Sequence, residues 1–260
     1  MFVNKTKAKL QQGKAVWGVM VTFPAPTLLE MLGPLGFDWV LLDNEHGDFT
    51  VSNAEHCVRA CDVAGITPIV RPIVGRPDIV SPFMDRGCQG VQAPHINNAA
   101  EAKLLVDGIK YPPQGNRGFF RRTRSNDHGL GMESAEYLRR ANQETLIIAM
   151  IEEAEGIRNV KEIAETPGID VVFVGTGDLS VSLGYAGQMT HPKVIEAAEI
   201  CFKATKNAGK ICGVSCPEEK TEDYLERGVR FFHSSAHHLI QSTGTQYMKM
   251  VRAAAQRQGA

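Results

Sequence analysis

The chain alternates between short apolar runs and longer stretches in which apolar positions recur with a helical period. Near-continuous apolar runs are typical of parallel strands that are buried on both faces. We count eight such runs, at residues 15–22, 37–43, 67–71, 90–93, 145–152, 170–175, 210–215 and 229–234. Helical segments between them include residues 53–64, 99–109, 153–165 and 193–208, and several are closed by glycine.

Eight strand–helix repeats in a chain of 260 residues favour a (β/α)8 TIM barrel over an open, doubly wound sheet. No linker rich in Gly, Ser or Pro divides the sequence, so we expect a single domain over residues 1–260. One connection, residues 111–133, is longer than a plain loop and predicts a functional or mobile segment. The last helix, at about residues 240–256, has an apolar side beyond what barrel closure needs and suggests packing on a neighbouring subunit.

Charge and composition argue against several classes of protein. The chain has 28 Lys and Arg against 29 Asp and Glu, so its net charge of -1 gives no global attraction to nucleic acid or an anionic membrane. No apolar stretch resembles a signal peptide or the roughly 20 residues of a membrane span, which predicts a cytoplasmic protein. The six cysteines lack the CxxC spacing of zinc sites and predict free, buried thiols.

Two acidic residues mark the carboxyl ends of neighbouring strands, where barrel enzymes keep their catalytic groups. Glu152 ends one apolar run and Asp178 follows the next. Their hard oxygen ligands, with no cysteine or HxH pattern nearby, suit Mg²⁺ or Mn²⁺. Either acid alone would more often cap a helix or form a salt bridge, but their shared position favours a metal site.

The segment GTGDLS turns from the sixth strand into a helix start. Unpaired N–H groups around Gly177 and Asp178 can bind a carboxylate or phosphate. The alternative is an ordinary tight turn that Asp178 caps. The adjacent metal ligand favours the anion site.

A histidine and an arginine follow the second and third strands. His46 comes three residues after Asp43, whose carboxylate can set the tautomer and basicity of the imidazole, and is our candidate general base. A loop histidine is more often a surface residue, and only its barrel position raises His46 above the histidines at positions 56, 95, 128 and 191. Arg71 needs a partner if it is buried. That partner is either a developing oxyanion or enolate, or the carboxylate of Asp43 or Glu45.

Lysine placement separates two kinds of aldol chemistry. A Schiff-base enzyme needs a desolvated lysine inside the barrel. No predicted strand ends in lysine, and Lys210 precedes the seventh strand at the opposite face. Enolate chemistry on a metal is therefore favoured over an imine.

Five ordered motifs, LLDNEHGD, TPIVRP, YPPQGNRG, MIEEAEG and FVGTGDLS, resemble the hallmarks of the HpcH/HpaI aldolases almost from end to end. The resemblance implies a barrel of the phosphoenolpyruvate/pyruvate-binding superfamily with a divalent metal such as Mg, Mn or Co. It implies retro-aldol cleavage of a 4-hydroxy-2-oxo acid to pyruvate and an aldehyde, and the reverse addition, through a metal-bound pyruvate enolate. A homo-oligomer, hexamer or trimer, is implied on the same ground.

Matched by motif, the resemblance implies that Glu152 and Asp178 hold the metal and that the backbone at Gly177 and Asp178 binds the pyruvate carboxylate. His46 would act as the base and Arg71 would stabilise the enolate oxygen. Asp85, in the segment FMDRG, matches the acid that raises the basicity of the histidine, although the residues alone give no reason to choose it.

The departures from the family pattern concern the pocket. Met150 stands where relatives usually have a glutamine, so a polar substrate contact is lost, and Met20 stands at a tryptophan position. The seventh and eighth strands end in GVSCPEE and FFHSSAHH, without the usual aliphatic pair and the glycine and aspartate pattern. We expect these changes to alter which aldehyde fits.

The arginines at positions 117, 121, 122 and 124 either bind a second carboxylate or belong to a solvated or subunit-contact loop. Phe119 is expected to line the pocket or an interface. Two other functions stay open: a lyase of the same superfamily that acts on an acyl-CoA thioester, and a barrel that binds a keto acid without turnover.

Overall fold

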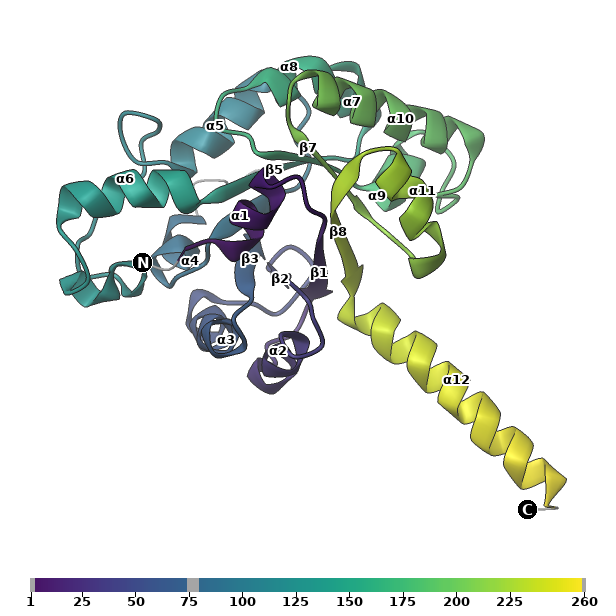
Figure 1. Ribbon diagram of the computed structural model, residues 1–260. Coiled ribbons are helices and arrows are strands. Elements are labelled where there is room, and N and C mark those ends of the chain that lie inside the picture. The colour runs from purple at the N-terminus through teal and green to yellow at the C-terminus, as the bar shows by residue number, and fades with distance from the viewer. Residues whose placement is uncertain (1–2, 74–79, 259–260) are drawn as a thin grey trace.

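The apolar runs form parallel strands that close into a barrel in the order β1 to β8 (Figure 1). The structure is a computed structural model that describes residues 3–73 and 80–258. The strands of the described chain are β1 Val16–Val21, β2 Trp39–Asp43, β3 Thr67–Arg71, β4 Gly90–Ala93, β5 Leu146–Ile151, β6 Val171–Val174, β7 Ile211–Ser215 and β8 Val229–Ser235. The predicted TIM barrel is confirmed, and β3 and β4 have the predicted bounds.

Helices precede, connect and follow the strands, and most of those that connect them cover the outside of the barrel. They are α1 Lys5–Gln11, α2 Pro26–Leu32, α3 Val51–Ala64, α4 Ser81–Asp85, α5 Ala99–Ile109, α6 Ser134–Glu144, α7 Ala154–Arg158, α8 Val160–Glu165, α9 Thr176–Ser182, α10 Pro192–Asn207, α11 Thr221–Glu226 and α12 Ala236–Arg257. The predicted helix at 153–165 is two helices, because the chain leaves helical geometry at Asn159. The last helix begins earlier than predicted, where the side chain of Ser235 accepts a hydrogen bond from the His238 N–H.

Successive strand residues face opposite sides, so the barrel has two apolar layers. The inner layer fills the barrel with large side chains, among them Trp39, Leu41, Ile148, Phe173 and Phe231. The outer layer packs the other strand faces against the helices. A filled interior leaves the carboxyl ends of the strands as the place for chemistry.

Helix α1 closes the opposite end of the barrel, in a segment where the sequence pattern predicts neither a strand nor a helix. Leu10 joins the inner layer. Lys7 forms an ion pair with Asp170, which directly precedes β6, and Lys9 forms one with Asp38, which directly precedes β2. The helix is short and its contacts are distributed over several strand starts, so no apolar period in the sequence reveals it.

The long connection at 111–133 is packed onto the protein for part of its length. Tyr111 is buried and contacts the rings of Tyr137 and Phe119. Residues Arg124–Gly129 form a short 3-10 turn. The buried beginning of this segment ties it to α6, and whether the rest moves stays a prediction.

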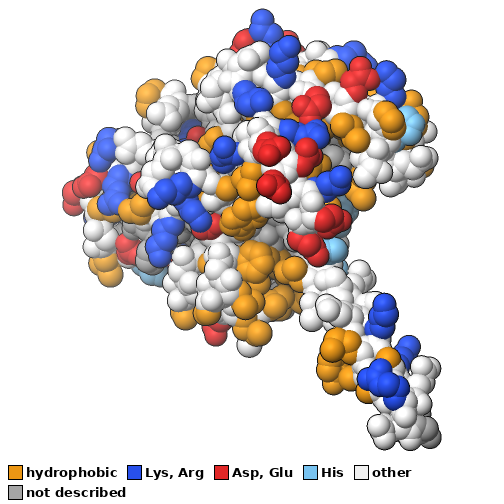
Figure 2. Space-filling view, turned by 45° about the vertical axis from the view of Figure 1, so that its right-hand side comes forward, with side chains coloured by type: hydrophobic (Ala, Val, Ile, Leu, Met, Phe, Trp, Pro, Cys, Tyr) orange, Lys and Arg blue, Asp and Glu red, His pale blue; other side chains and the backbone are white. Residues whose placement is uncertain are grey.

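Helix α12 runs away from the barrel, and nothing in the described chain covers most of its length (Figures 1 and 2). Ala236 is its one buried residue among those described. No helix among residues 3–73 and 80–258 is long and apolar enough to span a membrane. All six cysteines are free, as predicted, and all but Cys216 are buried.

Candidate active site

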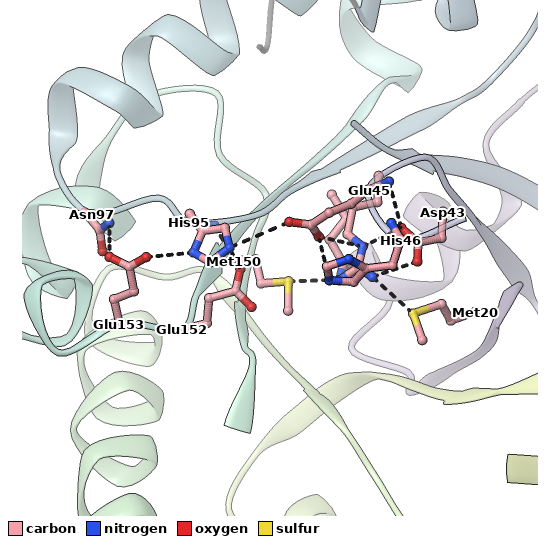
Figure 3. A network of polar contacts seen from close by, with 11 residues as sticks. Met20, Asp43, Glu45, His46, His95, Asn97, Met150, Glu152 and Glu153 are labelled. Carbon is pink, nitrogen blue, oxygen red and sulfur yellow. Dashed lines mark hydrogen bonds and ion pairs between the residues drawn. The ribbon is translucent and has the colours of Figure 1, made fainter. Parts of the chain in front are cut away.

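Polar side chains gather where β2, β3, β4 and β5 end, because barrel closure brings these ends to one rim. Figure 3 shows two groups there. Asp43, Glu45 and His46 come from the end of β2, and Glu152, Glu153 and His95 come from β5 and β4. Ion pairs of His95 with Glu45 and Glu152 join the two groups.

Glu152 follows β5 directly, and its side chain is 1% exposed. Its Oε1 accepts a 2.9 Å hydrogen bond from the backbone N–H of His95. Its Oε2 is buried and has no hydrogen-bond partner within the described chain. Burial is the main reason that the pKa of Glu152 is raised to about 7, and the charges of Asp178 and Glu45 act in the same direction. A bound cation would offset both effects, so this oxygen fits a metal ligand.

Asp178 and Gly177 lie in the first turn of α9 and are exposed. The charge of Asp178 acts on Glu152, which agrees with a shared rim for the two predicted ligands. Within residues 3–73 and 80–258, no group of three or more His, Cys, Asp or Glu side chains is arranged for a metal. An ion at Glu152 and Asp178 would therefore take its other ligands from water and substrate, as Mg²⁺ commonly does.

Arg71 makes the structural pair that the sequence left open. Its Nε and Nη2 each donate a 2.8 Å hydrogen bond to Asp43, and Nε lies 3.1 Å from Glu45 Oε2. Burial would lower the pKa of Arg71, but these two carboxylates outweigh it and raise the pKa. Two carboxylates therefore hold Arg71 at the rim.

His46 is exposed, with 66% of its side chain open to solvent. Its backbone N–H, not its ring, contacts Asp43, at 3.4 Å. The ring Nε2 lies 3.9 Å from Glu45 Oε2. Asp43 therefore positions the loop and Arg71, and the carboxylate beside the imidazole belongs to Glu45.

His95 is a rim residue that the sequence reasoning missed. Its Nδ1 lies 2.7 Å from Glu153 Oε1, and its Nε2 lies 3.6 and 3.7 Å from Glu45 and Glu152. Burial would lower the pKa of His95, but the carboxylates of Glu152 and Glu153 outweigh it and raise the pKa. Its φ of 52° is a left-handed conformation that costs a non-glycine residue about 1 kcal/mol. The signal was available, since His95 follows the end of β4 by two positions.

Two predicted site residues have other partners in the structure. Asp85 lies 2.5 Å from Arg117 Nη2, and it makes no hydrogen bond to His46 within the described chain. Phe119 packs on Tyr111 and Tyr137, and no contact joins it to the described rim residues. Their roles in catalysis and substrate binding gain no support from the geometry of a single chain.

Comparison with known proteins identifies the family of this chain. The family model of the HpcH/HpaI aldolase/citrate lyase family matches residues 18–240. The chain belongs to this family. It is 36% identical over 217 residues to the pyruvate aldolase of Rhizobium etli, covering 84% of each chain. It is 33% identical over 236 residues to the hydroxypyruvate/pyruvate aldolase of Delftia acidovorans, covering 88% of this chain and 84% of that protein.

A solved HpcH/HpaI aldolase from Desulfitobacterium hafniense superimposes with a TM-score of 0.89 at 28% identity, covering 95% of this chain and 96% of the other. The likeness extends over nearly the whole barrel. The rim described above is therefore the rim of an HpcH/HpaI barrel.

The interior of this HpcH/HpaI barrel has several polar side chains beneath its rim. Met150 is 6% exposed, and its sulfur accepts a 3.6 Å hydrogen bond from Nε2 of Gln92, a buried residue of β4. His233 of β8 stacks on Phe173 at 4.8 Å. Burial lowers the pKa of His233 to about 4, so this imidazole is neutral at physiological pH. Of these residues, the sequence singled out only Met150 by position.

Gly175 offers a test of how tightly Glu152 is placed. A Cβ at this position would lie 2.6 Å from both Glu152 Oε2 and Met150 Cε. We expect Gly175→Ala to push the carboxylate aside and to reduce turnover about 10- to 100-fold, as loss of support for a metal ligand does. Turnover and thermal unfolding should be measured beside Gly118→Ala, where a Cβ meets no atom within 4 Å. Equal activity of both variants would contradict the placement of Glu152.

Proposed function

We propose that this HpcH/HpaI family member is a class II pyruvate aldolase. It cleaves a 4-hydroxy-2-oxo acid to pyruvate and an aldehyde, and it catalyses the reverse addition. The observation that carries the proposal is the buried, unpaired Oε2 of Glu152 at the rim of a barrel from this family. The relatives named pyruvate aldolase and hydroxypyruvate/pyruvate aldolase support the pyruvate half.

Glu152 and Asp178 would hold a divalent metal, Mg, Mn or Co. When bound, such an ion acts as a Lewis acid that stabilises negative charge on the keto oxygen. The exposed backbone at Gly177, where a Cβ meets no atom within 4 Å, leaves room for the substrate carboxylate. Met150 would give the pocket an apolar wall.

His46 is open to solvent and is the proposed base. In the cleavage direction its imidazole takes the proton of the C4 hydroxyl, and the C3–C4 bond breaks to release the aldehyde. The electrons of the C3–C4 bond form a C2–C3 double bond as the π electrons of the keto group move to its oxygen, and the proton held by His46 is returned to C3 to complete pyruvate. Arg71, fixed by Asp43 and Glu45, places a positive charge at the rim where that oxygen becomes negative.

Two of the four arginines of the long connection are held by acidic residues, which reduces the positive charge available to an acyl-CoA thioester, while Arg121 and Arg122 are exposed. Arg117 and Arg124 are paired with Asp85 and Asp62, so they are not free to bind the phosphates of coenzyme A. The position of the buried lysine agrees with enolate chemistry. Lys110 donates a hydrogen bond to the carbonyl oxygen of Thr145, which precedes β5 at the end of the barrel opposite the rim. No imine-forming lysine lies among the described rim residues.

The test is exchange of the pyruvate methyl protons with D₂O, followed by NMR, because it requires no choice of aldehyde. We expect exchange that EDTA abolishes and added Mg²⁺ or Mn²⁺ restores, and that falls strongly in His46→Ala. Absence of exchange with pyruvate and metal bound would support the thioester lyase or a binding barrel instead. Cleavage assays with different aldehydes would then define the second substrate.

We also propose that the protein is a homo-oligomer, a trimer or hexamer, in the cytoplasm. Helix α12 exposes Ile240, Met248 and Val251 at helical spacing along one side. We expect Met248→Glu with Val251→Glu to lower the mass measured by light scattering, because charge would enter an apolar contact. The exposed Gln246→Glu is the control. An unchanged mass in the double variant would place the contact elsewhere.

A further inference from the structure

The amide of Gln92 is buried inside the barrel with little to bind. Gln92 is fully buried in β4. Its Oε1 has no hydrogen-bond partner within the described chain, and its Nε2 donates to the sulfur of Met150 at 3.6 Å. A thioether is a weak acceptor. Burying an amide on such terms is unfavourable, and polar groups left so poorly satisfied are commonly functional.

The position of Gln92 connects it to the rim. Gln92 lies beside Ile148 of the neighbouring strand β5. Its hydrogen-bond partner Met150 is two residues further along β5, and Glu152 is two residues beyond Met150. Met150 Cε and the unpaired Oε2 of Glu152 both lie next to Gly175, since a Cβ added to this glycine would be 2.6 Å from each of them. One flexible side chain therefore separates the Gln92 amide from the proposed site of the oxo acid.

Two other polar groups near this point, the Arg71 guanidinium and Glu152 Oε1, already have strong partners, whereas Glu152 Oε2 is an acceptor that the proposed metal would bind. Arg71 is held by Asp43 through two hydrogen bonds of 2.8 Å, and Glu152 Oε1 accepts from His95. Gln92 Nε2 has only sulfur as its acceptor. An oxygen of an entering ligand would be a much better acceptor, and the rotatable chain of Met150 can give way at small cost.

We propose that Gln92 is a substrate-binding residue that determines affinity for the 2-oxo acid. When the acid enters, Nε2 exchanges the Met150 sulfur for an oxygen of the carboxylate or keto group, and Met150 moves aside. This inference rests on the proposed function. In this proposal the polar contact to the substrate comes from Gln92 of β4, because Met150 of β5 has no polar group that could make it.

The test compares Gln92→Met, which keeps the size of the side chain, with wild type. We expect KM for pyruvate in methyl-proton exchange, and the dissociation constant measured by calorimetry with Mn²⁺ present, to rise about tenfold with little change in kcat. Gln89→Met is the matched control, because Gln89 directly precedes β4 at the opposite end of the barrel. The exchange variant Gln92→Met with Met150→Gln, which returns an amide to the same interior, should recover most of the affinity.

A structural amide, satisfied by an enclosed water, would leave KM and the dissociation constant unchanged in Gln92→Met, and that result overturns the proposal. If Gln92→Met does not fold, Gln92→Asn decides, because its shorter side chain keeps an amide in the interior but withdraws it from the ligand: a loss of affinity of about tenfold supports the proposal, and wild-type affinity overturns it. If wild type binds pyruvate but shows no exchange, the aldolase function fails, and the dissociation constants alone still decide the role of Gln92. A wild type that does not bind pyruvate overturns both.

Discussion

Glu152→Gln is expected to lower turnover by about a thousandfold or more while the barrel remains folded. The substitution keeps the shape of the side chain and removes the charge that would hold a divalent ion. Oε1 accepts from the His95 N–H and Oε2 is unpaired, so the amide disrupts little of the surrounding structure. Turnover and Mn²⁺ affinity by calorimetry should fall together.

The same variant has an opposite effect on stability. Burial raises the pKa of Glu152 from 4.5 in the unfolded chain to about 7. Ionisation of the buried acid is unfavourable in the folded protein, so the free energy of unfolding is highest below pH 4.5, where Glu152 is protonated in both states. It falls as the pH rises through about 7. In EDTA at pH 8 we expect Glu152→Gln to be more stable than wild type by up to about 3 kcal/mol in urea unfolding, and the gap should close at low pH.

The control is Glu155→Gln, an exposed acid in the first turn of α7. It should leave turnover, metal affinity and the pH dependence of unfolding as in wild type. Full turnover in Glu152→Gln would remove this residue from the proposed ligand set. Equal stability of Glu152→Gln and wild type at every pH would show that the carboxylate is not desolvated in solution.

Arg71→Met is expected to destabilise the protein by about 3–5 kcal/mol and to abolish most of the turnover. Asp43 is fully buried and the side chain of Glu45 is 6% exposed, so removal of Arg71 takes the guanidinium from two desolvated carboxylates and leaves Glu45 only its histidine neighbours. Burial already raises the pKa of Glu45 despite the opposing charge of Arg71. Urea unfolding near pH 7 measures the loss, and it should shrink as the pH falls and Glu45 takes up a proton.

A second substitution distinguishes charge from packing. Arg71→Met with Asp43→Asn should recover part of the stability, because one unpaired charge is removed, but none of the turnover. Arg59→Met breaks a pair with Glu55 whose arginine is 52% exposed, and such surface pairs contribute about 0–1 kcal/mol. If Arg71→Met unfolds at the same urea concentration as Arg59→Met, the buried ion pairs do not form in solution as they do in this structure.

The sequence contained most of the information about the barrel. Strands β3 and β4 and helix α5 have the bounds that apolar periodicity predicts, because a buried parallel strand and a helix each impose a short period on the chain. Apolar periodicity does not predict an element whose burial comes from contacts with residues far away in the chain. Helix α1 packs against the starts of several strands, and the segment after β5 breaks at Asn159, whereas its glycine, Gly156, lies inside α7 and not at the break.

The sequence by itself also predicted one rim for the candidate site, since the acids at 152 and 178 and the residues 43, 46 and 71 lie at or just after strand ends, and strand ends of a closed barrel must meet. Only the tertiary structure decided which of these groups bind one another. It pairs Arg71 with Asp43 and Glu45, gives Asp85 to Arg117, and places His95 between Glu45 and Glu152. It also sets Gln92 against Met150. These partners are far apart in the chain, and their pairing depends on strand register and on the closure of the barrel, which leave no period along the sequence.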